Sequence, residues 1–318
     1  MKRSLAIALL LQGCGGAMSA LEPAGPYAAR LESLWWFFFW ITIVPAAVVI
    51  GFALYAVRSA RPDRPAAADG RFLAIGTVLP LVVITVMFVR SMAVSNEVKG
   101  VPSTPADLRI EVIGHQFWFE VRYPDHRVVT ATEVHVPVGS EVELRVTSAD
   151  VIHSFWIPQA QGKIDMIPGH RNAIRLRVDE PGTYRGICTE FCGVQHALMG
   201  LLLVAHPAEA FDAWILAQQR DTSADATSPG ARHFERWCVE CHAIRGAFPA
   251  GATGSPGPDL THLATRRTLG SATLANNRGN LGGWILDPQP LKPGVRMPAS
   301  PLSPAELHEL LDYLESLR

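Results

Sequence analysis

Residues 188–199 of this 318-residue chain read CTEFCGVQHALM, a stretch that places two thiols, an imidazole and a thioether within twelve residues. These donors are soft, and soft donors select copper or another thiophilic metal. A mononuclear blue-copper loop has one cysteine, one histidine and a methionine, whereas a second cysteine, Cys192, follows Cys188 here after three intervening residues. Both sulfurs can therefore bridge two metal ions. Three other interpretations stay open at this point: a Cys188–Cys192 disulfide, a zinc site and a single blue copper.

A dinuclear site of this kind needs a second imidazole from another part of the chain. The natural candidate is His153, because it stands in a separate strand-like segment, VIHSFWIP. Two bridging thiolates with one terminal histidine on each copper delocalise the unpaired electron over both ions. The geometry then changes little on reduction, which suits rapid electron transfer better than substrate chemistry.

The residues around these motifs show the alternation of apolar and polar residues that is typical of an all-β domain. Short segments that alternate apolar with polar residues are separated by turn sequences such as Pro-Val-Gly-Ser and Glu-Pro-Gly-Thr. This pattern predicts a β-sandwich or barrel over residues 107–206. The alternating segments are Leu108–Val121, Glu133–Val138, Glu141–Thr147 and Ala173–Val178.

Two long apolar segments precede this domain. Leu34–Val57 carries no charge and would span about 36 Å as a helix, and Phe72–Val94 carries only Arg90, near its end. The loop between them is rich in arginine, which places it in the cytoplasm by the positive-inside rule. The sequence therefore predicts a two-helix transmembrane hairpin within residues 14–94, with everything after residue 94 outside. The alternative is a pair of buried core helices.

The N-terminus reads as an export signal. Lys2 and Arg3 are followed by a short apolar run, the arrangement of a secretory signal. The run ends in Leu11-Gln12-Gly13-Cys14, which resembles a bacterial lipoprotein box. Residues 1–13 are thus predicted as a signal peptide and Cys14 as the acylated residue. An ordinary signal peptide, or an uncleaved N-terminus with an incidental Cys14, is the alternative.

Together these features resemble subunit II of the haem–copper cytochrome c oxidases, over residues 31 to about 206. The matching motifs are GHQFWFEVRYP at 114–124, VIHSFWIPQAQGKIDMIPG at 151–169 and CTEFCGVQHALMG at 188–200. The resemblance implies a membrane hairpin followed by a Greek-key cupredoxin domain with a dinuclear copper A centre. It also implies that the Glu190 carboxylate helps to bind magnesium at the interface with subunit I. The copper donors that it implies are the side chains of His153, Cys188, Cys192, His196 and Met199, and the backbone carbonyl of Glu190.

Two positions depart from the family pattern. Many members have tryptophan directly after Gly-His-Gln, as the surface port for an electron from soluble cytochrome c, whereas this chain has Phe117, followed by Trp118. Phe117 and Trp118 are therefore the candidate electron-transfer residues. Many members also begin the second helix with a glutamate, whereas the aligned residue here is Leu73. These departures argue against direct docking of a soluble donor on the copper domain and against proton uptake through this subunit.

The C-terminal part of the chain, residues 228–318, contains Cys238-Val-Glu-Cys241-His242. C-x-x-C-H is the attachment motif of c-type haem: two thiols reach the two vinyl groups, and the histidine supplies the proximal imidazole. After Met199 the only methionine is Met297, which makes it the sixth ligand by elimination. Met/His coordination raises the haem potential. A free sixth position, or His262 as the ligand, is the alternative.

The sequence around this motif resembles an all-α class I cytochrome c domain. Gly257-Pro258-Asp259-Leu260 resembles the loop on the proximal side of the haem, and SPAELHELLDYLESLR reads as an amphipathic C-terminal helix. Residues 207–227 are predicted as a short helix and a flexible linker. A cytochrome c domain fused to subunit II is what caa-type oxidases show.

The resemblance implies subunit II of a caa-type, proton-translocating oxidase in a bacterial cytoplasmic membrane, with both domains on the periplasmic side. Electrons would pass from an external carrier, such as a cytochrome c, to haem c, then to copper A, then to the oxygen site in subunit I. The expected partners are subunits I and III, the donor and the membrane. A net charge of −1 gives no reason to expect nucleic acid. Three other functions are alternatives. A quinol-oxidase subunit II would lack the cysteine pair and the haem motif, and a nitrous-oxide-reductase-type protein would need a large propeller domain. A copper assembly or storage factor would lack the haem.

Overall fold

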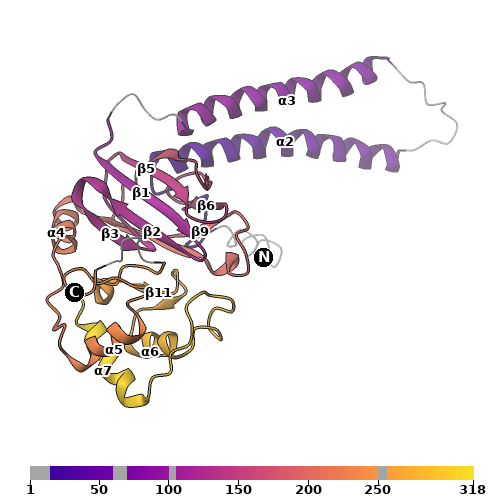
Figure 1. Ribbon diagram of the computed structural model, residues 1–318. Coiled ribbons are helices and arrows are strands. Elements are labelled where there is room, and N and C mark those ends of the chain that lie inside the picture. The colour runs from indigo at the N-terminus through magenta and orange to yellow at the C-terminus, as the bar shows by residue number, and fades with distance from the viewer. Residues whose placement is uncertain (1–14, 60–69, 100–104, 250–255) are drawn as a thin grey trace, which may run out of the picture.

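The computed structural model describes residues 15–59, 70–99, 105–249 and 256–318. The predicted signal peptide, Cys14 and most of the arginine-rich loop lie outside these ranges. The described chain forms a helical hairpin, a β-sandwich domain and a helical domain, in that order (Figure 1).

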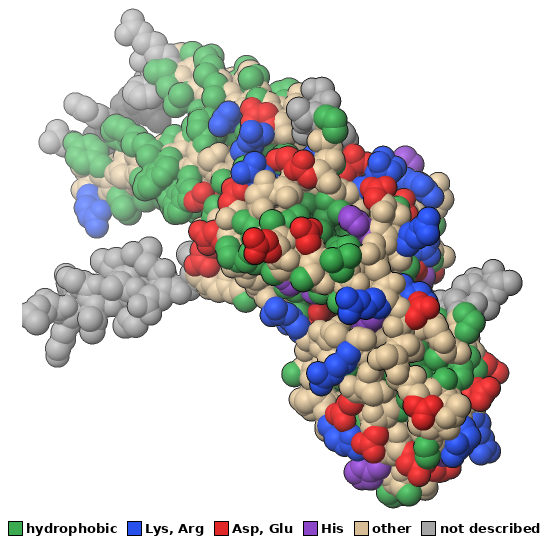
Figure 2. Space-filling model, turned by 90° about the vertical axis from the view of Figure 1, so that its left-hand side faces the viewer, with side chains coloured by type: hydrophobic (Ala, Val, Ile, Leu, Met, Phe, Trp, Pro, Cys, Tyr) green, Lys and Arg blue, Asp and Glu red, His purple; other side chains and the backbone are tan. Residues whose placement is uncertain are grey.

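The hairpin consists of α2 (Pro26–Arg58) and α3 (Gly70–Lys99). Both helices are long and apolar enough to cross a membrane, and only 0% and 6% of their apolar windows are buried. Figure 2 shows hydrophobic side chains gathered over these helices, where they protrude from the rest of the molecule. Such a surface is what a helix facing lipid needs, and it does not suit the core of a soluble domain.

Both helices are longer than the predicted spans 34–57 and 72–94. Their extra turns pack against the β-sandwich: the Tyr27 hydroxyl donates to Glu141 Oε2 at 2.7 Å, and Val98 is buried. Hydropathy detects the apolar run alone. It does not detect polar helical turns that are stabilised by contact with another domain.

The sandwich has two five-stranded sheets, and their strand orders are β3-β2-β1-β5-β8 and β4-β10-β9-β6-β7. Burial alternates along strands such as β5, as expected when one face of a sheet packs on a shared core, whereas β4 and β10 are buried on both faces. Two pairs are parallel, β1 with β5 and β4 with β10, as crossovers between the sheets require. The strands are β1 (Leu108–His115), β2 (Trp118–Tyr123), β3 (Val128–Ala131), β4 (Glu133–Pro137), β5 (Val142–Ser148), β6 (His153–Trp156), β7 (Ile164–Met166), β8 (Asn172–Leu176), β9 (Gly182–Cys188) and β10 (Gly200–His206).

The predicted strand segment Leu108–Val121 is in fact a hairpin. Strands β1 and β2 pair antiparallel, His115 opposite Trp118, and the chain turns at Gln116-Phe117. Two-residue hairpin turns are usually marked by asparagine, aspartate or glycine. Neither Gln116 nor Phe117 is such a residue, so the alternation of apolar and polar residues continues through the turn and the sequence does not indicate it.

The helical domain contains three main helices, α5 (Pro229–Trp237), α6 (Arg278–Leu286) and α7 (Pro304–Glu315), and a small ladder, β11 (Thr268–Leu269) with β12 (Leu274–Ala275). The predicted C-terminal helix is confirmed. It begins with a capping box, in which the Ser303 side chain accepts from the Glu306 backbone while the Glu306 carboxylate accepts from the Ser303 backbone. A separate helix, α4 (Ala208–Gln218), packs on the sandwich through Phe211, Trp214 and Ile215.

The segment predicted as a flexible linker has a defined path between α4 and α5. Arg245 holds it: Nη2 donates to the carbonyls of Gln218 at 2.5 Å and Arg220 at 2.6 Å, and Nε donates to Asp221 Oδ1 at 2.9 Å. Helix α5 begins at Pro229, where the Ser228 hydroxyl caps it by accepting from the Ala231 amide. The contacts of Arg245 lie at the start of the segment, at residues 218–221, and the flexibility of the rest stays a prediction.

Candidate metal and haem sites

The predicted copper loop lies at one end of the second sheet. Strand β9 ends at Cys188, and the Cys188 amide donates to Met199 O at 2.9 Å, which closes the loop just before β10 begins. The Thr189 amide donates to Ser154 O at 3.2 Å, which ties the loop to β6. Because β6 and β9 are neighbours, His153 at the start of β6 is carried to the cysteines.

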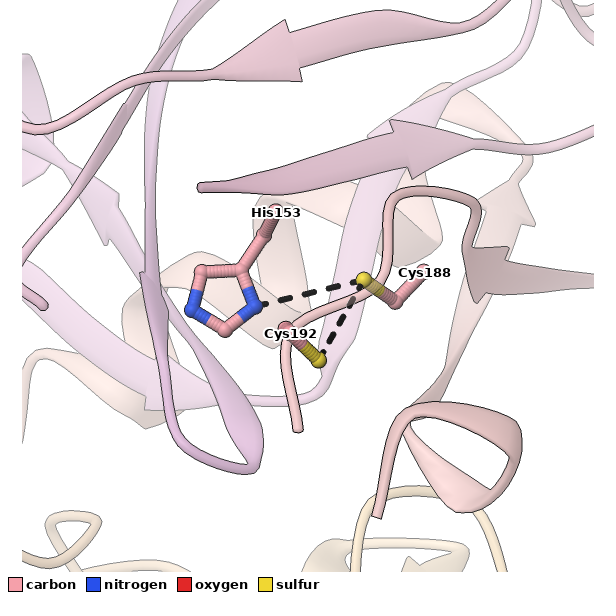
Figure 3. A group of neighbouring side chains, drawn as sticks. All are labelled: His153, Cys188 and Cys192. Atoms are coloured by element: carbon pink, nitrogen blue, oxygen red, sulfur yellow. Dashed lines mark hydrogen bonds between the residues drawn. The ribbon is translucent and has the colours of Figure 1, made fainter. Parts of the chain in front are cut away.

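The two cysteines and the two predicted histidine ligands form one cluster, in which His196 is half-buried and the other three residues are buried. The two Sγ atoms are 3.9 Å apart, His153 Nδ1 is 3.9 Å from Cys188 Sγ, and His196 Nδ1 is 3.8 Å from Cys192 Sγ. Figure 3 shows the imidazole of His153 turned toward both sulfurs, and the donor atoms of these three residues all lie within 4.8 Å of one another. The cysteines are free thiols, so the disulfide interpretation has no support in the structure.

The two remaining predicted donors divide evenly between the sulfurs. Met199 Sδ lies 3.8 Å from Cys192 Sγ, and the Glu190 carbonyl oxygen lies 3.3 Å from Cys188 Sγ. Each sulfur therefore has one imidazole and one weaker donor beside it. This arrangement fits two soft metal ions bridged by two thiolates, and it offers more donors than a single blue copper uses.

His153 is oriented by a neighbour that the sequence analysis missed. Its Nε2 lies 2.8 Å from Asp150 Oδ1, which leaves Nδ1 free to face the sulfurs. Ligating histidines commonly place their other ring nitrogen on a carboxylate in this way. Gly114 makes room for the ring, because a Cβ at that position would lie 2.8 Å from His153 Cδ2. The spacing Asp-x-x-His between Asp150 and His153 is the feature of the sequence that could have indicated this contact.

The cluster also favours the ionised form of Cys188. The adjacent Cys192 thiol lowers the pKa of Cys188, and His153 lowers it further, against the opposing effect of burial. The thiolate is the form that binds metal. The site is therefore suited to receive cations.

The predicted haem ligands line a cavity of about 470 Å³, a volume in the usual range for ligand pockets. The C-x-x-C-H motif forms part of its wall, and Met297 another. Residues Gln116, Phe117 and Trp118 of the β1–β2 turn also contribute, so the cavity opens toward the copper domain. The two candidate electron-transfer residues therefore lie at the wall between the two sites.

His242 has the environment of an axial ligand. Its Nδ1 lies 2.8 Å from Pro258 O and donates to it, which leaves Nε2 free. Burial lowers the pKa of His242, so the ring is neutral and can bind a metal. Gly257 permits this packing, since a Cβ there would lie 2.7 Å from His242 Cε1. The cysteines Cys238 and Cys241 are free thiols on the same cavity.

The two candidates for the sixth position lie in different places. Met297 lines the cavity, whereas His262 is buried outside it, with Nε2 3.1 Å from Arg220 O. The residues present therefore fit a covalently attached haem with a histidine and a methionine on the same cavity.

Comparison with known proteins agrees with this division. Residues 127–206 match the family "Cytochrome C oxidase subunit II, periplasmic domain", and residues 227–318 match the family "Cytochrome c". The first family implies copper A and the second implies haem c.

Similar proteins extend over nearly the whole chain. Cytochrome c oxidase subunit 2 of Alkalihalophilus pseudofirmus is 32% identical, over 98% of this chain and 95% of that protein. Cytochrome c oxidase subunit 2 of Bacillus subtilis is 30% identical, over 98% of this chain and 95% of that protein. Among solved structures, the periplasmic domain of subunit II of the cytochrome oxidase of Bradyrhizobium japonicum is 30% identical, covers 37% of this chain and 97% of that one, and has a TM-score of 0.36. The chain belongs to the cytochrome c oxidase subunit II family, in a form that carries a cytochrome c domain after its copper domain.

Proposed function

We propose that this chain is subunit II of a caa-type cytochrome c oxidase. It accepts electrons from an external carrier at haem c and passes them through copper A to the oxygen site in subunit I. The observation that carries this proposal is the wall shared by the two sites: Phe117 and Trp118 of the copper domain line the cavity that also holds His242 and Met297. When bound, the copper pair and the haem would each take up and release one electron.

The side chains have distinct roles in this proposal. Cys188, Cys192, His153, His196, Met199 and the Glu190 carbonyl would hold the copper pair. Cys238 and Cys241 would attach the haem, and His242 and Met297 would hold its iron. Asp150 and Pro258 fix the two imidazoles, because an oxygen of each accepts a hydrogen bond from the other ring nitrogen of His153 and His242, respectively.

The membrane assignment completes the proposal. Helices α2 and α3 anchor the chain in a bacterial cytoplasmic membrane beside subunits I and III, with both domains on the periplasmic side and a lipid on Cys14. Among the described residues, the one group of three histidine, cysteine or acidic side chains able to hold a metal is His153, Cys188 and Cys192. Magnesium at the Glu190 carboxylate would therefore need ligands from subunit I.

Metal analysis with low-temperature EPR on the full chain in detergent tests the proposal. We expect two coppers for each haem iron and a seven-line hyperfine pattern, because the unpaired electron is shared by two copper nuclei. Cys188→Ser should abolish that pattern and leave the haem spectrum unchanged. A four-line signal, or haem without copper, would contradict the relay and leave a membrane-tethered cytochrome c.

A further inference from the structure

The segment just before Met297 is seated on the copper domain through a buried lysine. The Lys292 side chain is 1% exposed, and its Nζ donates to Leu198 O at 3.0 Å and to Gly270 O at 2.9 Å. Leu198 directly precedes the copper ligand Met199, whereas Gly270 belongs to the haem domain. One ammonium group therefore joins the two domains next to a copper donor.

An arginine next to Met297 makes a second connection. The Arg296 guanidinium donates to Gln116 Oε1, and it lies 4.0 Å from Asp150 Oδ2. The other oxygen of Asp150 contacts His153 Nε2 at 2.8 Å, and Gln116 Nε2 donates to Cys192 O at 2.7 Å. Arg296 is thus one residue from a proposed haem ligand and one hydrogen bond from the groups that hold two proposed copper ligands.

A third contact points the same way. The Gln195 side chain, next to the copper ligand His196, donates to Pro293 O. The polar contacts that Lys292, Pro293 and Arg296 make with the copper domain therefore all end beside a proposed copper ligand or on its immediate support. Arg267 and Thr268 join the domains elsewhere, at Glu133 and Thr183. The contacts of residues 292–296 differ from these because they meet the groups that support the proposed copper ligands.

We propose that Lys292 and Arg296 are positioning residues that hold the Met297 loop against the copper loop and so set the rate of electron transfer from haem to copper. This inference rests on the proposed function and names the residues that would govern its internal step. Electron tunnelling falls steeply with distance, so a small separation of the two loops slows it.

The two residues differ in what they contribute. Lys292 is the main anchor, because its buried ammonium is a charged donor to one carbonyl of each domain, and the other donor to these carbonyls is the single hydroxyl of Thr273. The Arg296 side chain is 65% exposed, and an ion pair with such a partner adds little stability. Arg296 therefore aligns the loops more than it holds them together.

The arrangement also explains what replaces a soluble donor on the copper domain. The β1–β2 turn, with Gln116, Phe117 and Trp118, faces the cavity of the haem domain. The chain's own haem domain covers this part of the copper domain, and an external carrier would reach the haem instead. A tethered partner acts at a high effective concentration, so weak aligning contacts are sufficient.

The test measures electron transfer within the full chain in detergent, loaded with both cofactors. A photoexcited ruthenium complex reduces the haem, and the absorbance of the copper centre reports arrival of the electron. We expect the rate to fall about tenfold or more in Lys292→Met and about threefold in Arg296→Gln, with partial recovery in Arg296→Lys. The haem and copper midpoint potentials and the copper EPR signal should be unchanged.

Arg278→Gln is the matched control, because that guanidinium pairs with Asp312 at 2.8 Å and with Glu315 at 2.5 Å, inside the haem domain. Its rate should stay within about twofold of the parent chain. Unchanged rates in Arg296→Gln and Lys292→Met would overturn the inference, and so would a slower rate fully explained by a shifted potential. A parent chain that lacks copper or transfers no electron would instead refute the proposed function.

Discussion

At the scale of single residues, Asp150 supports the proposed copper ligand His153. The carboxylate receives the amides of Gln116 and Val151, both at 2.7 Å, so it is itself held in place while it orients His153. A supporting group that is fixed in this way keeps the imidazole in one orientation. An isosteric change at Asp150 therefore alters metal binding without changing a ligand.

We predict that Asp150→Asn lowers copper affinity about 10- to 100-fold, the usual cost of losing such a support. The measurement is copper retention against a graded chelator, followed by EPR. Asp165→Asn is the control, because this carboxylate is exposed and pairs with Lys163 at 2.8 Å. Equal copper retention in the two variants would show that Asp150 does not orient the ligand.

Met297 makes a separate prediction at the haem. Met297→Leu should lower the haem midpoint potential by a substantial part of the ~0.8 V range that axial ligands span, because the thioether stabilises the reduced iron. His262→Gln should leave the potential unchanged, since His262 lies outside the cavity. Redox titration followed in the visible spectrum measures both. An unaltered potential in Met297→Leu would remove it as the ligand.

The sequence predicts which side chains the structure brings together at the proposed copper site, but not the groups that support them. Cys188, Cys192, His196 and Met199 are close in the chain, so their spacing is readable, and C-x-x-C-H is equally local. Asp150 lies close to His153 in the chain, but its role depends on the Gln116 amide, which reaches it from another strand. Lys292 gave no signal at all, because its partner Leu198 is far away in sequence.

At the scale of elements, the pair of strands β4 and β10 brings two histidines together. His135 Nδ1 and His206 Nε2 are 2.8 Å apart, and Trp214 of α4 stacks on His135 at a centroid distance of 4.1 Å. Burial, together with the charges of His135 and Arg267, lowers the pKa of His206 to about 4. Burial also lowers the pKa of His135, although Glu133 opposes this effect. The folded chain thus prefers two neutral rings.

This preference makes stability depend on pH. An unfolded histidine has a pKa of about 6.5, so between pH 6.5 and about 4 the unfolded chain binds protons that the folded His206 does not. The free energy of unfolding should therefore be largest above pH 6.5 and fall as the pH drops toward 4. Melting temperatures of the full chain at pH 7.5, 6 and 5 measure this. His206→Gln should reduce the loss, and an equal loss in this variant would place its origin elsewhere.

The elements themselves were predicted unevenly, for physical reasons. The C-terminal helix carries its own capping box, so its start was readable at Ser303. Helix α2 begins eight residues before its apolar run, at Pro26, because contacts such as that of Tyr27 with Glu141 stabilise its first turns. Local signals predict elements that are stabilised locally, and they fail where another domain supplies the contact.

At the scale of the whole molecule, Glu133 joins the two domains at a distance from the Lys292 contact. This buried carboxylate of the copper domain accepts from the amides of Arg267 and Thr268 at 2.7 and 3.0 Å and from the Thr268 hydroxyl at 3.3 Å.

Glu133→Ala leaves these donors unsatisfied, which should weaken the interface by about 2 kcal/mol. If the two domains unfold as one unit because of this interface, calorimetry on the full chain should show one transition for the parent and two for the variant, with the haem domain melting first. Glu180→Ala, which removes an exposed carboxylate on the turn before β9, should keep the parent behaviour. A single transition at the parent temperature in Glu133→Ala would mean that the remaining contacts between the domains, among them those of Lys292 with Leu198 and of Ser271 with Gly200, are sufficient to hold them together. The relay geometry would then not depend on Glu133.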